Sequence, residues 1–189
     1  MRGTLFLLLA VTLQLCGQQP AKRVSLPTFP LPSESEWLER RDPGLHDGLN
    51  PILLKALRKE FHCTLCKTVG GRQINLGRLG SAAVAWDGSE GQCGATGNCA
   101  FYLLYRDETG IRSIQIDFGW TYAIMKSSTN VPDLVFMANM SYRSGGARRY
   151  SFVRGAFVQT GCDDVELNES VESAYILNPE QVTVKPCDR

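Results

Sequence analysis

Cysteines are the residues of this sequence with the most distinctive chemistry. Cys63 and Cys66 are separated by two residues, a spacing that zinc sites and redox-active dithiols share. A zinc site needs a second pair of ligands, and Cys93 and Cys99 have five residues between them rather than two. A redox dithiol needs the N-terminus of a helix, whereas Cys63 follows the helix that we expect. We therefore expect disulfides here, with no metal and no cofactor.

The first 17 residues are typical of a secretory signal peptide. Arg2 precedes an eleven-residue apolar run, Leu5 to Leu15, which is too short to span a bilayer. Cleavage after Gly17 would suit the preference for small residues at the cut. An alternative interpretation is a lipid anchor at Cys16. In both cases we expect a secreted or periplasmic protein with no transmembrane segment in the mature chain.

Six of the seven cysteines follow the signal peptide, and an even number in an exported chain favours disulfide bonds. Six cysteines allow fifteen pairings, and the sequence alone does not choose among them. We prefer the local scheme: Cys63 with Cys66, Cys93 with Cys99, and Cys162 with Cys187. In the chain-entropy model the 93–99 bond contributes about 2 kcal/mol and the 162–187 bond about 3.5 kcal/mol.

The N-terminal part is expected to be helical after a Pro-rich, extended leader at 18–32. Ser33 and Glu36 have capping-box spacing, which predicts one or two helical turns. Asn50 and Pro51 then suit the N-cap and the first residue of a helix whose apolar residues recur at helical spacing. These helices define a helical segment at 33–66.

Short β-like runs broken by Gly, Asp and Asn follow in 67–189, which predicts a β-rich body. Consecutive strands joined by short links should pair as neighbours. The fold class expected is therefore α+β: short N-terminal helices packed on a mainly antiparallel, disulfide-stapled β-sheet or partly open barrel. Residues 33–189 would then form one domain. The expected strands are 82–86, 100–106, 113–118, 122–126, 134–140, 150–159 and an edge strand at 182–184, with a short helix capped by Asn168 before the last. Gly155 predicts a bulge or kink that splits the run 150–159 in two.

Charge argues against a nucleic-acid partner. Arg2 is the only ionisable side chain in the signal peptide, so the mature chain has 19 basic and 19 acidic residues. Nucleic-acid binding relies on a basic surface that releases counterions from phosphates. A formally neutral chain has no such surface overall.

The segment 142–155 is the most suggestive binding element because its four arginines are interleaved with three aromatic residues, as a basic, aromatic hairpin would have them. Such a hairpin could hold an anionic or sugar-like partner through cation–π contacts and guanidinium hydrogen bonds. The alternative is an ordinary hairpin that turns at Gly145 and Gly146, with its aromatic side chains packed inward. The candidate binding residues are Tyr142, Arg143, Arg148, Arg149, Tyr150 and Arg154.

The sequence contains few residues suited to acid–base or nucleophilic catalysis, since it has only two histidines. His46 stands beside Asp47, but no Gly-x-Ser-x-Gly motif supplies a serine nucleophile. No catalytic residue is assigned. We expect a non-catalytic binding or inhibitory module whose partner is a protein or a glycan in the envelope or outside the cell. The alternative is a small secreted hydrolase that uses carboxylates or His46.

Residues 76–162 carry the stretches GRLGSAAVAW, CGATGNCAFYLLYR, NVPDLVF and RRY. This region resembles a poorly characterised group of secreted bacterial proteins that share a C-x-x-T-G-N-C turn, a DLV strand and an aromatic hairpin. The resemblance implies secretion and no established activity or catalytic residue. Within it, SGGARRY is similar to the Ser/Gly-rich, lysozyme-contacting loop of periplasmic lysozyme inhibitors.

Overall fold

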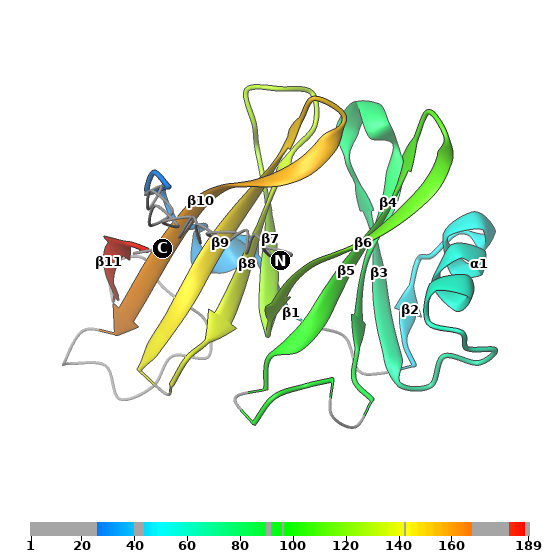
Figure 1. The fold of residues 1–189 in the computed structure, drawn as a ribbon, viewed down its shortest axis with the longest axis horizontal. Coiled ribbons are helices and arrows are strands. Elements are labelled where there is room, and N and C mark those ends of the chain that lie inside the picture. Colours follow the sequence, from blue (N-terminus) through cyan, green and yellow to red (C-terminus); the bar gives the residue numbers. More distant parts are fainter. Residues whose placement is uncertain are drawn as a thin grey trace, which may run out of the picture.

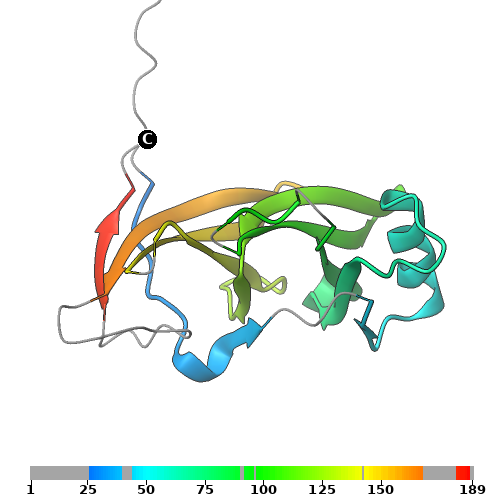
Figure 2. The ribbon, with the colours of Figure 1, turned by 90° about the horizontal axis from the view of Figure 1, so that it is seen from below.

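The computed structural model describes residues 26–39, 44–89, 92–95, 97–141, 143–167 and 182–187, and the statements below concern these residues. They form two β-sheets, one α-helix and two short 3-10 helices. Figures 1 and 2 show the two sheets side by side, with the helix at the far end of one of them.

The five-stranded sheet has the order β2-β3-β4-β5-β6, and the six-stranded sheet has the order β1-β7-β8-β9-β10-β11. Every pairing between named strands is antiparallel except the short parallel pairing of β2 with β3. The strands are β1 (Trp37–Glu39), β2 (His46–Asp47), β3 (Val69–Asn75), β4 (Ser81–Asp87), β5 (Cys99–Asp107), β6 (Gly110–Gly119), β7 (Thr121–Met125), β8 (Asp133–Asn139), β9 (Ser144–Val153), β10 (Ala156–Leu167) and β11 (Val182–Pro186); the helices are η1 (Glu34–Glu36), α1 (Pro51–Glu60) and η2 (Gly77–Leu79).

The chain passes from the five-stranded sheet back to the six-stranded sheet at Trp120, between the end of β6 and the start of β7. The Trp120 N–H donates to the carbonyl of Met137 in β8 at 2.9 Å. A Cβ atom at position 119 would lie 2.6 Å from that carbonyl oxygen, which is too close for any side chain. Gly119 therefore permits the close approach of the two sheets at this crossing.

The main hydrophobic core lies between the two sheets. Phe101 of β5, Tyr122 of β7 and Phe136 of β8 are fully buried, and their ring centroids lie 5.2 to 6.1 Å apart. Aromatic pairs at such distances contribute about 0.5–1.5 kcal/mol each beyond the burial of their area. This aromatic cluster joins the inner faces of the sheets.

Helix α1 forms as the sequence predicts. The Asn50 side chain accepts a hydrogen bond from the N–H of Leu53 at 3.0 Å, and Pro51 occupies the first turn. Leu53 and Leu57 are buried in a second cluster against β3, β4 and β5. The helix thus covers the outer face of the five-stranded sheet.

Residues 26–32, here called the N-terminal strap, lie on the six-stranded sheet. Phe29 is buried in a third cluster with residues of β7, β8, β9 and β10. Its N–H donates to the Asp163 carboxylate at 3.2 Å, and the Arg149 guanidinium lies 5.3 Å from its ring centroid. The extended leader predicted from composition therefore has an anchoring side chain, Phe29, that its Pro-rich composition does not indicate.

The predicted α+β class is wrong: the structure is mainly antiparallel β, with two sheets, a single α-helix and no closed barrel among the described residues. The Ser33–Glu36 capping box forms, but it starts one 3-10 turn. Trp37 is then buried on the six-stranded sheet, and β1 pairs with β7. Tertiary pairing overrides the local helical signal here.

The sequence pattern does not predict strand β3, because two glycines interrupt its β-like run. A Cβ at Gly70 would lie 2.2 Å from the indole ring of Trp86. The glycine leaves room for Trp86, on the neighbouring strand β4, to lie across β3. Glycine in a strand often marks such a close approach.

The three disulfides of the structure are the three pairs expected from the sequence: Cys63–Cys66, Cys93–Cys99 and Cys162–Cys187. The second lies in the connection between β4 and β5, and the third ties β10 to the end of β11. The predicted helix capped by Asn168 lies outside the described residues, as does the signal peptide.

Candidate functional site

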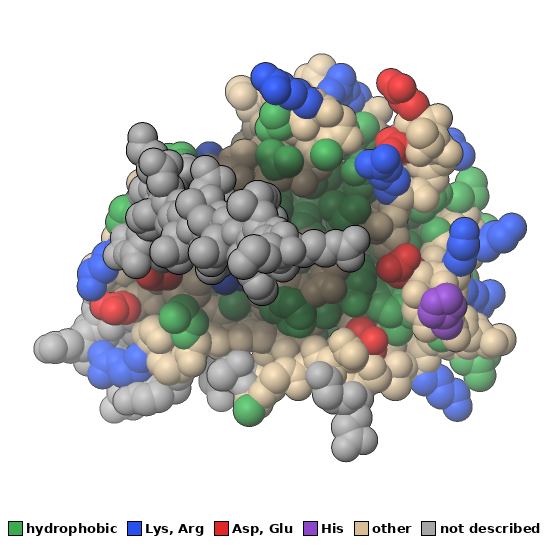
Figure 3. All heavy atoms as spheres, viewed as in Figure 1, with side chains coloured by type: hydrophobic (Ala, Val, Ile, Leu, Met, Phe, Trp, Pro, Cys, Tyr) green, Lys and Arg blue, Asp and Glu red, His purple; other side chains and the backbone are tan. Residues whose placement is uncertain are grey.

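Three connections meet at one end of the space between the sheets and enclose a cleft of about 890 Å³. They are η2, the β5–β6 turn and the β9–β10 turn, which lie at the top of Figure 1. Figure 3 shows hydrophobic side chains in a hollow on this face, with charged side chains around its upper rim. We call it the arginine cleft; its lining is Arg78, Leu79, Arg106, Asp107, Glu108, Thr109, Arg112, Phe152, Arg154, Gly155 and Ala156.

The β5–β6 turn is held by Asp107. Its carboxylate accepts hydrogen bonds from the N–H of Thr109 at 2.7 Å and from the Thr109 hydroxyl at 2.6 Å. This local side-chain bonding is the reason that Asp favours turns. The turn places Arg106, at the end of β5, and Arg112, near the start of β6, on the same cleft.

The β9–β10 turn consists of Arg154 and Gly155, which both have positive φ angles, 50° and 89°. Two such residues in succession are typical of the type I′ turn of a two-residue hairpin, which favours Asn-Gly. An arginine in this left-handed region costs about 1 kcal/mol. Arg154 is therefore an unfavourable turn residue that lines the cleft.

The cleft contains four arginines against two acidic residues. Arg112 forms an ion pair with Asp107. The hydrogen bonds from Thr109, with a smaller contribution from Arg112, lower the pKa of the Asp107 carboxyl. The Arg78 guanidinium lies 5.7 Å from the ring centroid of Phe152, within cation–π range.

Arg106 and Arg154 differ from the other arginines of the cleft in their interactions. Both side chains are exposed, and neither forms an ion pair with a residue that the structure describes. Within the described residues, no carboxylate therefore lies at ion-pair distance from either guanidinium.

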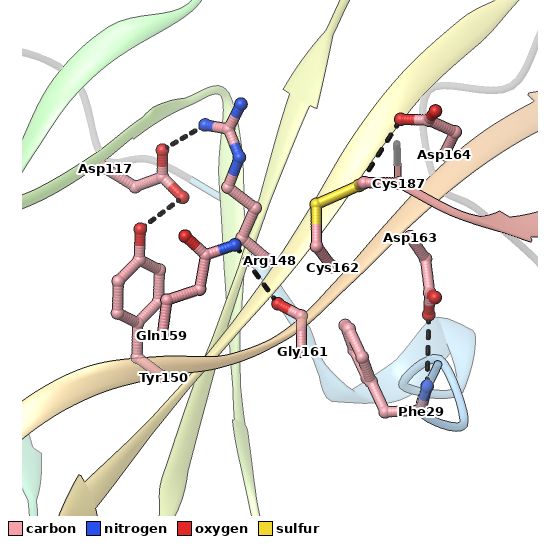
Figure 4. Close-up of a disulfide and its surroundings, with 10 residues drawn as sticks. All are labelled: Phe29, Asp117, Arg148, Tyr150, Gln159, Gly161, Cys162, Asp163, Asp164 and Cys187. Carbon is pink, nitrogen blue, oxygen red and sulfur yellow. Dashed lines mark hydrogen bonds and ion pairs between the residues drawn. A yellow bond between two sulfur atoms is a disulfide. The ribbon is translucent and has the colours of Figure 1, made fainter. Parts of the chain in front are cut away.

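A different arrangement, here called the Asp117 bridge, joins the sheets below the cleft. Arg148 of β9 donates to one carboxylate oxygen of Asp117 in β6 at 2.6 Å. The Tyr150 hydroxyl donates to the other at 3.1 Å. Figure 4 shows both side chains pointing at this carboxylate. The backbone N–H of Phe118 donates to the first oxygen as well, at 2.7 Å. The Asp117 side chain is 5% exposed, so its charge depends on these three donors.

The structure separates the candidate residues of segment 142–155. Arg154 lines the cleft, and Arg148 and Tyr150 form the Asp117 bridge. Arg149 points to the opposite face, where it lies over Phe29. Arg143 belongs to the β8–β9 connection, and Tyr142 lies outside the described residues.

The predicted hairpin turn at Gly145 and Gly146 is wrong. Both residues lie inside β9 and pair with β8 on one side and β10 on the other. A Cβ at Gly145 would lie 2.8 Å from the carbonyl oxygen of Ala138. These glycines serve strand packing, and the β8–β9 connection forms just before them, where the N–H groups of Met140 and Ser141 donate to the carbonyl of Ser144. The predicted strand 150–159 is divided by the β9–β10 turn at Arg154 and Gly155, so the irregularity expected at Gly155 is a full hairpin turn.

Sequence reasoning missed Arg78, Arg106 and Arg112. Arg78 lies within GRLG, and Arg106 and Arg112 lie close to DETG, two stretches whose residues are typical of turns. No other local feature of the sequence indicates that these arginines lie at a cleft. Their meeting depends on which turns the two-sheet topology brings together, which no local pattern encodes.

The remaining candidates have simple positions. His46 lies in β2 opposite Gly71, and its Nε2 atom is buried without a hydrogen-bond partner in the described part of the chain. The side chain of Asp47 lies outside the description. No cluster of three metal-ligating side chains occurs within the described ranges.

No helix among the described residues is both long enough and apolar enough to cross a membrane. The three disulfides fit an extracellular or periplasmic protein, because such bonds persist in oxidising compartments. Comparison with protein-family models, with curated proteins and with solved structures finds no match to this chain.

Proposed function

We propose that this chain is an exported, non-catalytic binding module and that the arginine cleft holds an anionic ligand. The observation that carries the proposal is the position of Arg106 and Arg154. Both line one cleft, from two different hairpins, without an ion-pair partner among the described residues. An incoming anion can therefore approach either guanidinium without displacing a carboxylate that is already bound to it.

The chemistry of arginine favours binding over catalysis at this site. A guanidinium group stays protonated at any physiological pH, so it orients an anion through several N–H donors but transfers no proton. Phe152 supports this role because its ring lies under the Arg78 guanidinium and limits where that group can point.

The cleft also has an apolar side. Leu79, Phe152 and Ala156 line it together with the arginines. Its volume lies within the range of about 300–1,000 Å³ that is typical of ligand sites. Such a mixed lining suits a ligand with an apolar portion next to its negative charge.

The test is an NMR titration of the oxidised protein with citrate as a small anionic probe. We expect amide shifts to concentrate at residues 106–112 and 152–156. The double variant Arg106→Glu and Arg154→Glu should weaken citrate binding at least about tenfold, since each charged hydrogen bond is worth about 1.5–3 kcal/mol.

The matched control is Lys55→Glu with Lys67→Glu, which changes the net charge equally at exposed positions outside the cleft. This control should bind citrate like the wild type. Equally weakened citrate binding in both double variants would mean that only the net charge of the protein matters, and it would contradict a specific site.

A further inference from the structure

The ligand class of the arginine cleft follows from the strand that borders it. Strand β6 is the last strand of the five-stranded sheet, and no described strand pairs with its outer edge. Arg112, the third residue of β6, lines the cleft, as does the turn that precedes the strand. The free edge of β6 therefore begins inside the cleft.

The two halves of β6 differ in how this edge is protected. In the second half, the register with β5 shifts between Phe101 and Tyr102, and Asp117 is held by the six-stranded sheet. Bulges and inward-pointing charges are the usual protection of an edge strand. The first half pairs regularly with β5, from Gln115 opposite Tyr102 to Gly110 opposite Asp107. It has neither protection.

A regular edge presents backbone N–H and C=O groups that an extended peptide can pair with. A saccharide or a lipid headgroup has no matching ladder of donors and acceptors. The open volume of the cleft lies between the start of β6 and the β9–β10 turn, so an added strand has space at this position.

The charges of the lining point the same way. Asp107 and Glu108 stand among the arginines, and Asp107 already holds Arg112. A dense polyanion would bring negative groups against these two acids. The whole chain has a formal charge of only +1, which adds no general attraction for such a polymer. Spaced carboxylates fit this mixed pattern better.

We infer that the arginine cleft binds an extended acidic peptide segment of a partner protein, which pairs with the edge of β6 over residues 110–115. This inference rests on the proposed anion-binding function. Because side chains alternate along a strand, every second residue of the segment faces the cleft. Its carboxylates contact Arg106 and Arg154, and its apolar groups lie against Phe152 and Leu79.

The probe is a fluorescein-labelled decapeptide, Glu-Ser-Leu-Ser-Glu-Ser-Leu-Ser-Glu-Ser, which places glutamate and leucine on the same face of an extended strand. Its binding is measured by fluorescence anisotropy against the oxidised protein. A second peptide has the same sequence with N-methyl groups on alternate residues, which remove the donors of one edge and keep every charge. We expect the methylated peptides, prepared in both possible frames, to differ: one frame should bind at least about tenfold more weakly than the parent peptide.

The protein variants separate the two levels of the proposal. The double variant Arg106→Glu and Arg154→Glu should lose peptide binding, and Lys55→Glu with Lys67→Glu should retain it. If both methylated frames bind as tightly as the parent peptide, edge pairing is wrong, whereas citrate binding at the arginines would leave the anion site standing. If neither citrate nor peptide responds to the arginine variant, the proposed function itself fails.

A sulfated oligosaccharide provides the opposite class of ligand. The inference expects it to bind more weakly than the parent peptide at equal concentration of charge. Tighter binding of the oligosaccharide, with loss in the same arginine variant, would overturn the choice of a peptide partner.

Discussion

The arginine cleft and the Asp117 bridge lie in the same space between the sheets, yet they use arginine in opposite ways. At the bridge, Arg148 is held by the Asp117 carboxylate, which is almost completely buried and also accepts hydrogen bonds from the Tyr150 hydroxyl and the Phe118 N–H. In the cleft, Arg106 and Arg154 are exposed and form no ion pair within the described residues. A paired arginine of this kind supports the fold, and an unpaired one is available to a ligand.

The largest effect expected from this difference is on stability. Arg148→Ala leaves the Asp117 carboxylate buried with one donor fewer, and we expect it to lower the free energy of unfolding by about 2 kcal/mol. Arg106→Ala removes an exposed, unpaired side chain, so its effect should stay within about 0.5 kcal/mol. Urea unfolding monitored by tryptophan fluorescence measures both. Equal losses in the two variants would remove the distinction.

The next effect concerns Arg154, whose backbone conformation suits asparagine better than arginine. Arg154→Asn should raise the free energy of unfolding by about 1 kcal/mol and, at the same time, weaken citrate binding. Thermal unfolding and the citrate titration test the two parts. A variant that is more stable and binds normally would show that Arg154 is not a ligand contact.

A smaller, pH-dependent effect on stability is expected from a buried carboxylate, Asp163, which lacks the full set of donors that Asp117 has. Asp163 is completely buried, and one of its carboxylate oxygens has no partner among the described residues, while the other accepts the Phe29 N–H. Burial raises the pKa of Asp163, and the nearby charge of Asp164 raises it further. The hydrogen bond from the Phe29 N–H and the positive charge of Arg149 lower it, but the net shift is upward.

A pKa raised by folding favours the protonated form in the folded state. The stability that Asp163 contributes is therefore complete below its unfolded pKa of about 3.9 and is lost as the pH rises through its folded pKa. Asp163→Asn does not titrate, so its stability relative to the wild type should increase as the pH rises from about 4 to 7. Urea unfolding at a series of pH values measures this difference, and a constant difference would contradict the assigned burial cost.

Local signals predicted part of this structure well. The Asn50 cap, the alternating strands after Ala82 and the three short-range disulfides all depend on residues close in sequence. The prediction of a helix after Ser33 failed because Trp37 gains more from burial on the six-stranded sheet than its segment gains from a helix. The turn at Gly145 failed because glycine also serves close packing between strands.

A smaller part of the candidate site than of the fold could be predicted from the sequence. Arg154 was among the predicted binding residues, but Arg78, Arg106 and Arg112 were not. They come from connections that are separated along the chain, and only the packing of two sheets brings them to one cleft. Segment 142–155 was interpreted as a single surface, whereas strand alternation sends Arg148 and Arg149 to opposite faces.

The most direct test of the division between binding and folding arginines is the citrate affinity of two variants, Arg106→Ala with Arg154→Ala and Arg148→Ala. It is measured by NMR at a temperature at which both are folded, from the amide shifts of Thr109 and Gly155. The account predicts at least about tenfold weaker binding in the first and nearly wild-type binding in the second. Wild-type affinity in the first, or a loss confined to the second, would contradict it.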